Sequence, residues 1–133
     1  MRKLCAALLP LLFVVAGCGD PNAPPMGTVS GTVTVGGQPP TEPFRIVFSN
    51  STTGQGSAGE VEEDGGYELE TPLPVGEYQV YFIMSNKMQS DAPRSTDAEI
   101  VKSIPRQYQS ESSPLTEAVA EGSNTIDVDV PAE

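Results

Sequence analysis

From Thr28 onward, apolar and polar residues alternate with a period of two, and this alternation constrains the fold more than any other feature of the chain. The clearest runs are Val29 to Val35, Phe44 to Phe48 and Tyr78 to Met84. Residues spaced by two share one face of a β-strand, whereas a helix needs a spacing of three to four. Many of the 13 Gly and 13 Pro separate the runs at short intervals. The sequence therefore predicts an all-β chain of short strands.

Turn signals extend this pattern to the rest of the chain. The segment 58–70 is predicted as a hairpin, because Asp64-Gly65-Gly66 supplies residues that readily adopt positive φ. Leu115 to Ala120 and Ile126 to Val130 are predicted as a final pair of strands joined at a turn. About seven short strands with turn residues between them are typical of a single β-sandwich, here over residues 28–131.

One long stretch, from Ser85 to Ser103, is polar and has no alternation. It is predicted as a loop, and loops of this length are usually either functional or disordered. Within it, Thr96 to Glu99 matches a capping box for one helical turn.

The N-terminus has the organisation of an export signal. Arg2 and Lys3 precede an apolar run from Leu4 to Val15, which a small-residue segment follows. This run is too short to span a bilayer, which needs about 20 residues, so we expect residues 1–17 to be removed on export.

Val15-Ala16-Gly17-Cys18 resembles the lipobox of bacterial lipoproteins, in which the cysteine is acylated. The resemblance implies that Cys18 is the lipid attachment site and that Gly19 after it directs the protein to the outer membrane, facing the periplasm or the cell surface. The alternative is an ordinary signal peptide with a coincidental cysteine. Cys5 lies in the removed segment, so the mature chain keeps one Cys and forms no internal disulfide.

Residues 18–27 are predicted as the lipidated cysteine and a proline-rich tether. Within them, Gly19 to Met26 contain three prolines and no hydrophobic pattern, which predicts an extended segment spanning roughly 25 Å at about 3.1 Å per residue. The domain beyond it is acidic, because all 18 Asp and Glu follow the cleavage point. An anionic surface repels nucleic acid, so no nucleic-acid partner is expected and the membrane is contacted through the lipid anchor. The oligomeric state and any protein or glycan partner stay open.

Several short motifs, in order, resemble the carboxypeptidase regulatory-like, or transthyretin-like, β-sandwich module. The resemblance covers about residues 29–130 and implies an immunoglobulin-like or transthyretin-like sandwich. The segment 40–43 departs from the family pattern, which leaves the register of the second strand open. The matching motifs are Val29-Ser30-Gly31-Thr32-Val33, Gly37-Gln38-Pro39, Asp64-Gly65-Gly66-Tyr67-Glu68-Leu69 and Pro74-Val75-Gly76-Glu77-Tyr78-Gln79-Val80. The tail, Ile104-Pro105-Arg106-Gln107-Tyr108, Ser113-Pro114-Leu115 and Asn124-Thr125-Ile126-Asp127-Val128, is similar to a variant found in small bacterial lipoproteins.

Catalytic chemistry has few candidates. The chain contains no His, which excludes Ser-His-Asp and Cys-His catalysis and His-ligated metals, and two Cys cannot complete a zinc site. Carboxylate pairs need a cleft that a small sandwich without Trp is not expected to provide. We therefore expect no enzymatic activity and no cofactor.

An acidic hairpin is the candidate ligand site. With Val61 and the apolar residues 67 and 69 facing the core, four carboxylates point outward from paired strands, where like charges repel. A bound Ca²⁺ or simple ionic screening would offset this repulsion, and screening is expected to suffice. The four candidates are Glu60, Glu62, Glu68 and Glu70.

These observations favour a lipid-anchored envelope protein that acts as a non-enzymatic binding or structural module. The alternative is a carbohydrate- or peptide-binding accessory subunit of an export or surface-degradation complex. A cluster of exposed aromatic side chains would favour this alternative.

Overall fold

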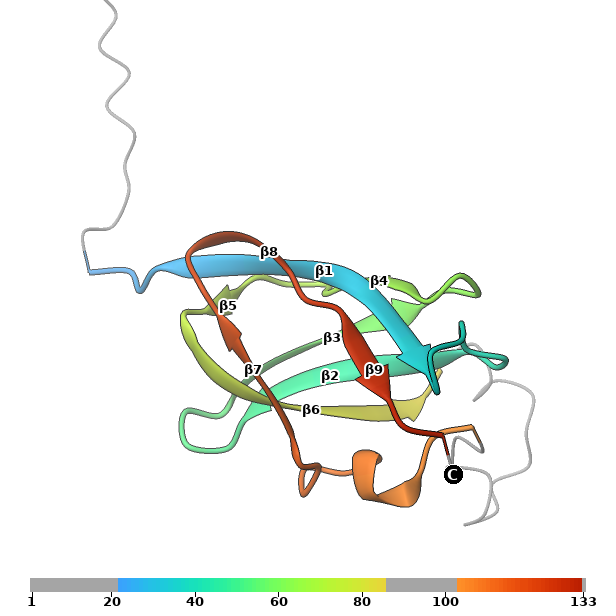
Figure 1. Ribbon diagram of the computed structural model, residues 1–133. Coiled ribbons are helices and arrows are strands. Elements are labelled where there is room, and N and C mark those ends of the chain that lie inside the picture. Colours follow the sequence, from blue (N-terminus) through green and yellow to red (C-terminus); the bar gives the residue numbers. More distant parts are fainter. Residues whose placement is uncertain (1–21, 86–102, 133) are drawn as a thin grey trace, which may run out of the picture.

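The computed structural model describes residues 22–85 and 103–132 (Figure 1). These residues form nine β-strands and one short 3-10 helix, η1 (Arg106–Tyr108), so the chain is all-β, as the alternation predicts. None of the helices in this described part is long and apolar enough to cross a membrane. Cys18 and the predicted capping box at Thr96 lie outside the described residues.

The predicted alternating runs become strands. Gly36 and Gly37 have φ of 59° and 76°, which ends the first strand, and Gly65 has φ of 87° in the hairpin turn. Two short strands, β5 and β8, exceed the predicted number of about seven. The strands are β1 (Met26–Val35), β2 (Phe44–Asn50), β3 (Gln55–Val61), β4 (Gly66–Glu68), β5 (Leu73–Pro74), β6 (Gly76–Met84), β7 (Leu115–Val119), β8 (Gly122–Thr125) and β9 (Val128–Val130).

All nine strands belong to one open sheet. Its main path runs β5-β1-β4-β3-β2-β6-β7, and the paired strands along this path are antiparallel. Off this path, β8 and β9 each pair in parallel with β1. The second strand pairs in a regular register, with Arg45 opposite both Glu60 and Ile83.

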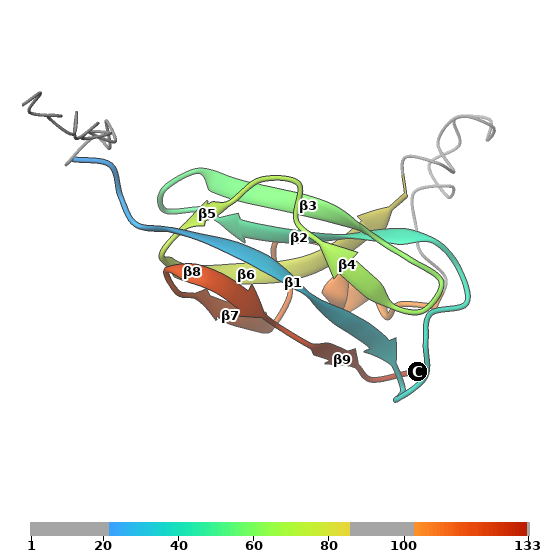
Figure 2. The same ribbon diagram turned by 90° about the horizontal axis from the view of Figure 1, so that it is seen from above.

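The sheet is curved, so that its two ends approach each other. Seen from above, β7, β8 and β9 lie on one side of the molecule, and β2 and β3 lie on the other (Figure 2). The backbone of Gly27 in β1 lies so close to the end of β7 that an added Cβ would be 2.1 Å from the carbonyl oxygen of Ala120. The apolar faces of the strands are therefore enclosed, and their buried side chains form a single core cluster.

Most of the side chains that the alternation predicts to face the core in the longest runs are buried in the structure. Tyr78, Val80 and Phe82 of β6 are at most 2 % exposed. Burial of one such side chain stabilises a fold by about 1.5–3 kcal/mol, so these strands supply much of the hydrophobic free energy.

The prediction that the last two strands pair with each other is wrong. β7 pairs with β6, whereas β8 and β9 pair with β1. The side chain of Asn124 ties the β7–β8 connection to β1: it accepts a hydrogen bond from Ala120 N and donates to the carbonyl oxygens of Ala120 and Thr28. Alternation indicates that a segment is a strand and carries no information about its partner.

The parallel pairing of β1 is interrupted at Gly31 and Thr32, between β8 and β9, and side chains supply the hydrogen bonds there. Between β8 and β9, the carboxylate of Asp127 accepts a hydrogen bond from Thr32 N at 3.0 Å, in place of a backbone carbonyl. Across the sheet, Tyr67 of β4 pairs with Gly31, and its hydroxyl donates to the carbonyl oxygen of Ile126 at 2.6 Å. Burial, with smaller effects from nearby carboxylates, raises the pKa of Tyr67 above its ordinary value. The hydroxyl therefore stays protonated and able to donate.

Candidate functional site

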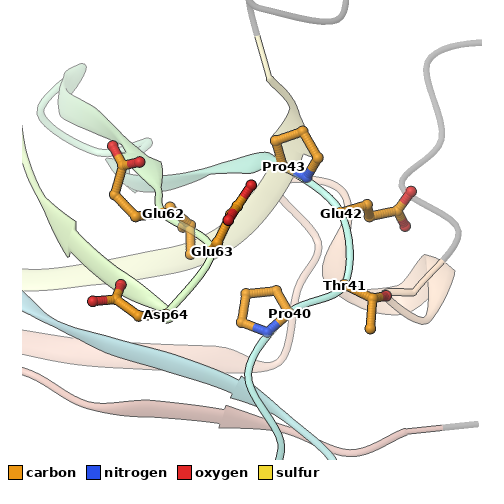
Figure 3. Close-up of a pocket in the computed structure, with 8 residues that line it drawn as sticks. Pro40, Thr41, Glu42, Pro43, Glu62, Glu63 and Asp64 are labelled. Atoms are coloured by element: carbon orange, nitrogen blue, oxygen red, sulfur yellow. The ribbon is translucent and has the colours of Figure 1, made fainter.

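A surface hollow lies between the β1–β2 connection and the β3–β4 turn (Figure 3). We call it the acidic groove. Its volume is about 680 Å³. Buried Val61 contributes apolar surface, and two prolines stiffen one wall. The lining residues are Pro40, Thr41, Glu42, Pro43, Val61, Glu62, Glu63 and Asp64.

The two walls of the acidic groove are held together through Gly65. Its carbonyl oxygen accepts a hydrogen bond from Val33 N at 2.7 Å, which fixes the hairpin turn against β1. An added Cβ on Gly65 would lie 2.4 Å from the carbonyl oxygen of Val33 and 3.5 Å from Pro40. The turn therefore depends on glycine for both its positive φ and its close approach to β1.

The carboxylates of the acidic groove point in different directions. Glu62 and Asp64 point to one side, and Glu42 points to the other (Figure 3). Glu42 accepts a hydrogen bond from Ser103 N at 2.6 Å, and Asp64 accepts one from Gly66 N at 2.8 Å. The arrangement presents dispersed negative charge rather than carboxylates that converge on one point.

The predicted outward face of the acidic hairpin is present. Val61, Tyr67 and Leu69 are buried, and Glu62, Glu68 and Glu70 are exposed. Glu60 is half-buried, and its carboxylate accepts a hydrogen bond from the hydroxyl of Ser85 at 2.7 Å. Only Glu62 of the four candidates also lines the acidic groove.

Sequence reasoning missed Arg45, which neutralises part of this face. Its Nε lies 3.5 Å from a carboxylate oxygen of Glu60, and its Nη2 lies 2.6 Å from one of Glu70. The Arg45 side chain is only 12 % exposed. A signal for this role exists in the sequence, since Arg45 is the one basic residue between Met26 and Ser85 and stands at an outward position of its strand.

Among the described residues, no group of three or more Cys, Asp or Glu side chains is placed so that it could hold a metal ion. Glu60 and Glu70 instead share Arg45 as their counter-ion. Whether calcium or ionic screening offsets the repulsion between the glutamates of this hairpin stays a prediction. The ion pairs of Arg45 already reduce that repulsion, so we expect screening to suffice.

A second hollow lies at the opposite end of the strands, beside the β2–β3 turn, with a volume of about 380 Å³. The side chain of Asn50 organises it: Oδ1 accepts hydrogen bonds from Thr52 N and Thr53 N, and Nδ2 donates one to the carbonyl oxygen of Glu77. The Asn50 side chain is thus engaged in closing the turn.

Comparisons with protein-family models, curated protein sequences and solved structures gave no match for this chain.

Replacing Arg45 with methionine is expected to lower the free energy of unfolding by about 1 kcal/mol, because Glu60 and Glu70 lose their shared cation. Sodium chloride should raise the melting temperature of this variant more than that of the wild type, since the uncovered repulsion is screened. Thermal unfolding at low and high salt measures both effects.

Arg106→Met is the matched control, because Arg106 is exposed on η1 and the change in net charge is the same. Calcium at matched ionic strength should give no further rise in Arg45→Met. A rise specific to calcium that Glu62→Gln with Glu68→Gln removes would instead establish a metal site.

Proposed function

We propose that this protein is a lipid-anchored component of a bacterial envelope and acts as a non-enzymatic binding module. In this proposal, Cys18 carries the lipid, residues 18–27 provide the connection to the membrane, and the folded domain presents the acidic groove to a partner. The curved sheet is proposed to be a β-sandwich of the transthyretin-like type, which its enclosed single core supports. The lipobox resemblance supports location at the outer membrane.

The position of the acidic groove relative to the N-terminal end of β1 carries the proposal. β1 begins at Met26, so the last two residues of the predicted segment 18–27 belong to the sheet, and the 10 residues of β1 span about 30 Å. The groove begins beyond the far end of this strand, at Pro40. An anchor at Cys18 would thus leave the groove at the pole that is distant from the membrane, where it is accessible to other envelope components.

The chemistry of the groove favours recognition over catalysis. General acid–base catalysis needs groups that converge on one reacting atom, and the labelled carboxylates diverge (Figure 3). Dispersed carboxylates on both walls of the groove, one of which carries two prolines, suit a basic, extended peptide, which gains charge–charge attraction along its length. A basic segment of another envelope protein is therefore the proposed ligand class.

Carbohydrate binding, the alternative, is less well supported by the described aromatic side chains. Tyr67, Tyr78 and Tyr108 are at most 7 % exposed, and Tyr81 is half-buried. The described surface thus offers no cluster of exposed rings on which sugars could stack.

Site-specific photo-crosslinking in intact cells tests the proposal. A benzophenone amino acid at Thr41, in the groove wall, should form a covalent adduct with a protein partner. The adduct should fall at least about fivefold in Glu62→Gln with Glu63→Gln, because loss of two carboxylates weakens a charge-based contact by about 1 kcal/mol or more.

The same crosslinker at Thr52, in the second hollow, is the matched control and should give no adduct that depends on Glu62 and Glu63. Equal adducts at both positions, or a groove adduct that is insensitive to the two carboxylates, would contradict groove recognition. Retention of the protein on insoluble polysaccharide without a protein adduct would favour the alternative.

A further inference from the structure

Two large hydrophobic side chains are strongly exposed in the described part of the chain, and their backbone segments lie side by side at one end of the sheet. Met26 is 43 % exposed and Val75 is 45 % exposed. Met26 of β1 pairs with Pro74 of β5, and Val75 N donates to the carbonyl oxygen of Pro25 at 3.0 Å. We call Pro25, Met26, Pro74 and Val75 the apolar tip.

The apolar tip lies where the folded domain joins its tether. Cys18 stands eight positions before Met26 in the sequence. β1 leads away from this end toward the acidic groove, so the tip and the groove occupy opposite ends of the domain (Figure 1). The apolar tip lies beside the tether, so a lipid anchor at Cys18 would hold it close to the lipid surface.

We propose that the apolar tip rests on the lipid surface to which Cys18 is anchored; the inference depends on the anchor of the proposed function. A chain of eight residues keeps the tip within roughly 25 Å of the bilayer. Attachment makes the contact intramolecular, with an effective concentration in the millimolar range, so a weak contact is populated. Methionine, valine and proline side chains enter the interfacial region without leaving a charge unpaired.

The charges around the apolar tip define the lipid it accepts. Glu77 is exposed just after Val75, and exposed Glu121 precedes Gly122, which pairs with Gly27 beside Met26. Anionic headgroups repel these carboxylates within a Debye length of about 10 Å at 0.1 M salt. The tip therefore contacts zwitterionic lipid more closely than anionic lipid. Contact between the apolar tip and the lipid keeps β1 pointing away from the bilayer, an orientation we call upright, and this places the acidic groove at the end distant from the membrane.

Tryptophan fluorescence tests the contact directly, because the chain contains no Trp. Full-length Val75→Trp and Gln38→Trp proteins, expressed and lipidated, are reconstituted into phosphatidylcholine vesicles with and without brominated phosphatidylcholine. Gln38 is an exposed residue in the turn after β1, at the other end of the domain. Emission from position 75 should shift to the blue and be quenched at least about twofold by brominated lipid, whereas emission from position 38 should be unchanged.

Vesicle flotation separates the two possible failures. Proteins that float but show equal, unquenched emission at positions 75 and 38 overturn the tip contact and leave the anchor intact. Proteins that do not float overturn the anchor and this inference together. Replacing part of the phosphatidylcholine with phosphatidylglycerol at low salt should reduce the quenching, and an increase would overturn the assignment to zwitterionic lipid.

A second measurement avoids the affinity that tryptophan itself has for membranes. With Cys5 removed by processing and Cys18 acylated, Gln38→Cys provides a single free thiol for a fluorescent donor. Energy transfer to an acceptor lipid should be low when the tip holds the domain upright. It should rise in Met26→Ser with Val75→Ser, because the domain then tilts freely, and unchanged transfer would overturn the proposal.

Discussion

Substitution of Gly31 by alanine is expected to lower the melting temperature by about 8 °C or more. An added Cβ would lie 2.0 Å from the carbonyl oxygen of Ile126, which cannot move without displacing β8 and β9 from β1. The carbonyl oxygen of Ile126 also accepts a hydrogen bond from the Tyr67 hydroxyl, so the substitution weakens this part-buried hydrogen bond as well. Overpacking costs about 1–3 kcal/mol and the hydrogen bond adds about 1 kcal/mol. Each kcal/mol lowers the melting temperature of a domain of this size by about 4–8 °C.

Gly76→Ala is the matched control, since the nearest atom to its added Cβ is Tyr78 Cε2 at 3.9 Å. This variant should be neutral or stabilised by up to about 1 kcal/mol, because the unfolded chain loses conformational freedom. Equal destabilisation by Gly31→Ala and Gly76→Ala would contradict the close packing of the Ile126 carbonyl oxygen against Gly31 of β1. Should Gly31→Ala not fold, Tyr67→Phe isolates the hydrogen bond and should cost about 1 kcal/mol.

Substitution of Cys18 by serine is expected to abolish lipid attachment and to leave a precursor that keeps residues 1–17. The thiol is the acyl acceptor in the proposed pathway, and a serine hydroxyl is a much weaker nucleophile than a thiolate. Loss of two or three acyl chains removes about 0.8 kcal/mol of membrane affinity per buried CH₂, which amounts to complete loss of lipid anchoring. Labelling with radioactive palmitate and intact-protein mass spectrometry measure both effects.

Cys5→Ser is the matched control for this experiment, because Cys5 lies in the apolar run and should be removed with the signal. Its label and mature mass should equal those of the wild type. A Cys18→Ser protein that is cleaved normally would support the ordinary signal peptide instead and would remove the anchor from the proposed function.

The candidate sites were partly predictable. The alternation and the Asp64-Gly65-Gly66 turn indicate which face of the hairpin carries the glutamates, because a period of two assigns each residue to one face. The ion pairs of Arg45 with Glu60 and Glu70 were not predicted. They depend on β2 lying beside β3, and strand order is set by contacts between residues distant in the sequence.

The sequence by itself determined that the chain is all-β, where most strands lie, and which side chains of β6 face the core. Periodicity and turn chemistry decide these features locally, within a few residues of each position. Only the tertiary structure decided that β8 and β9 pair in parallel with β1 and that β7 pairs with β6. It also decided that residues 40–43 and 62–64 face each other across the acidic groove. Such pairings depend on how the whole core is packed, because many strand partners satisfy the same local alternation and only one arrangement encloses all the apolar faces together.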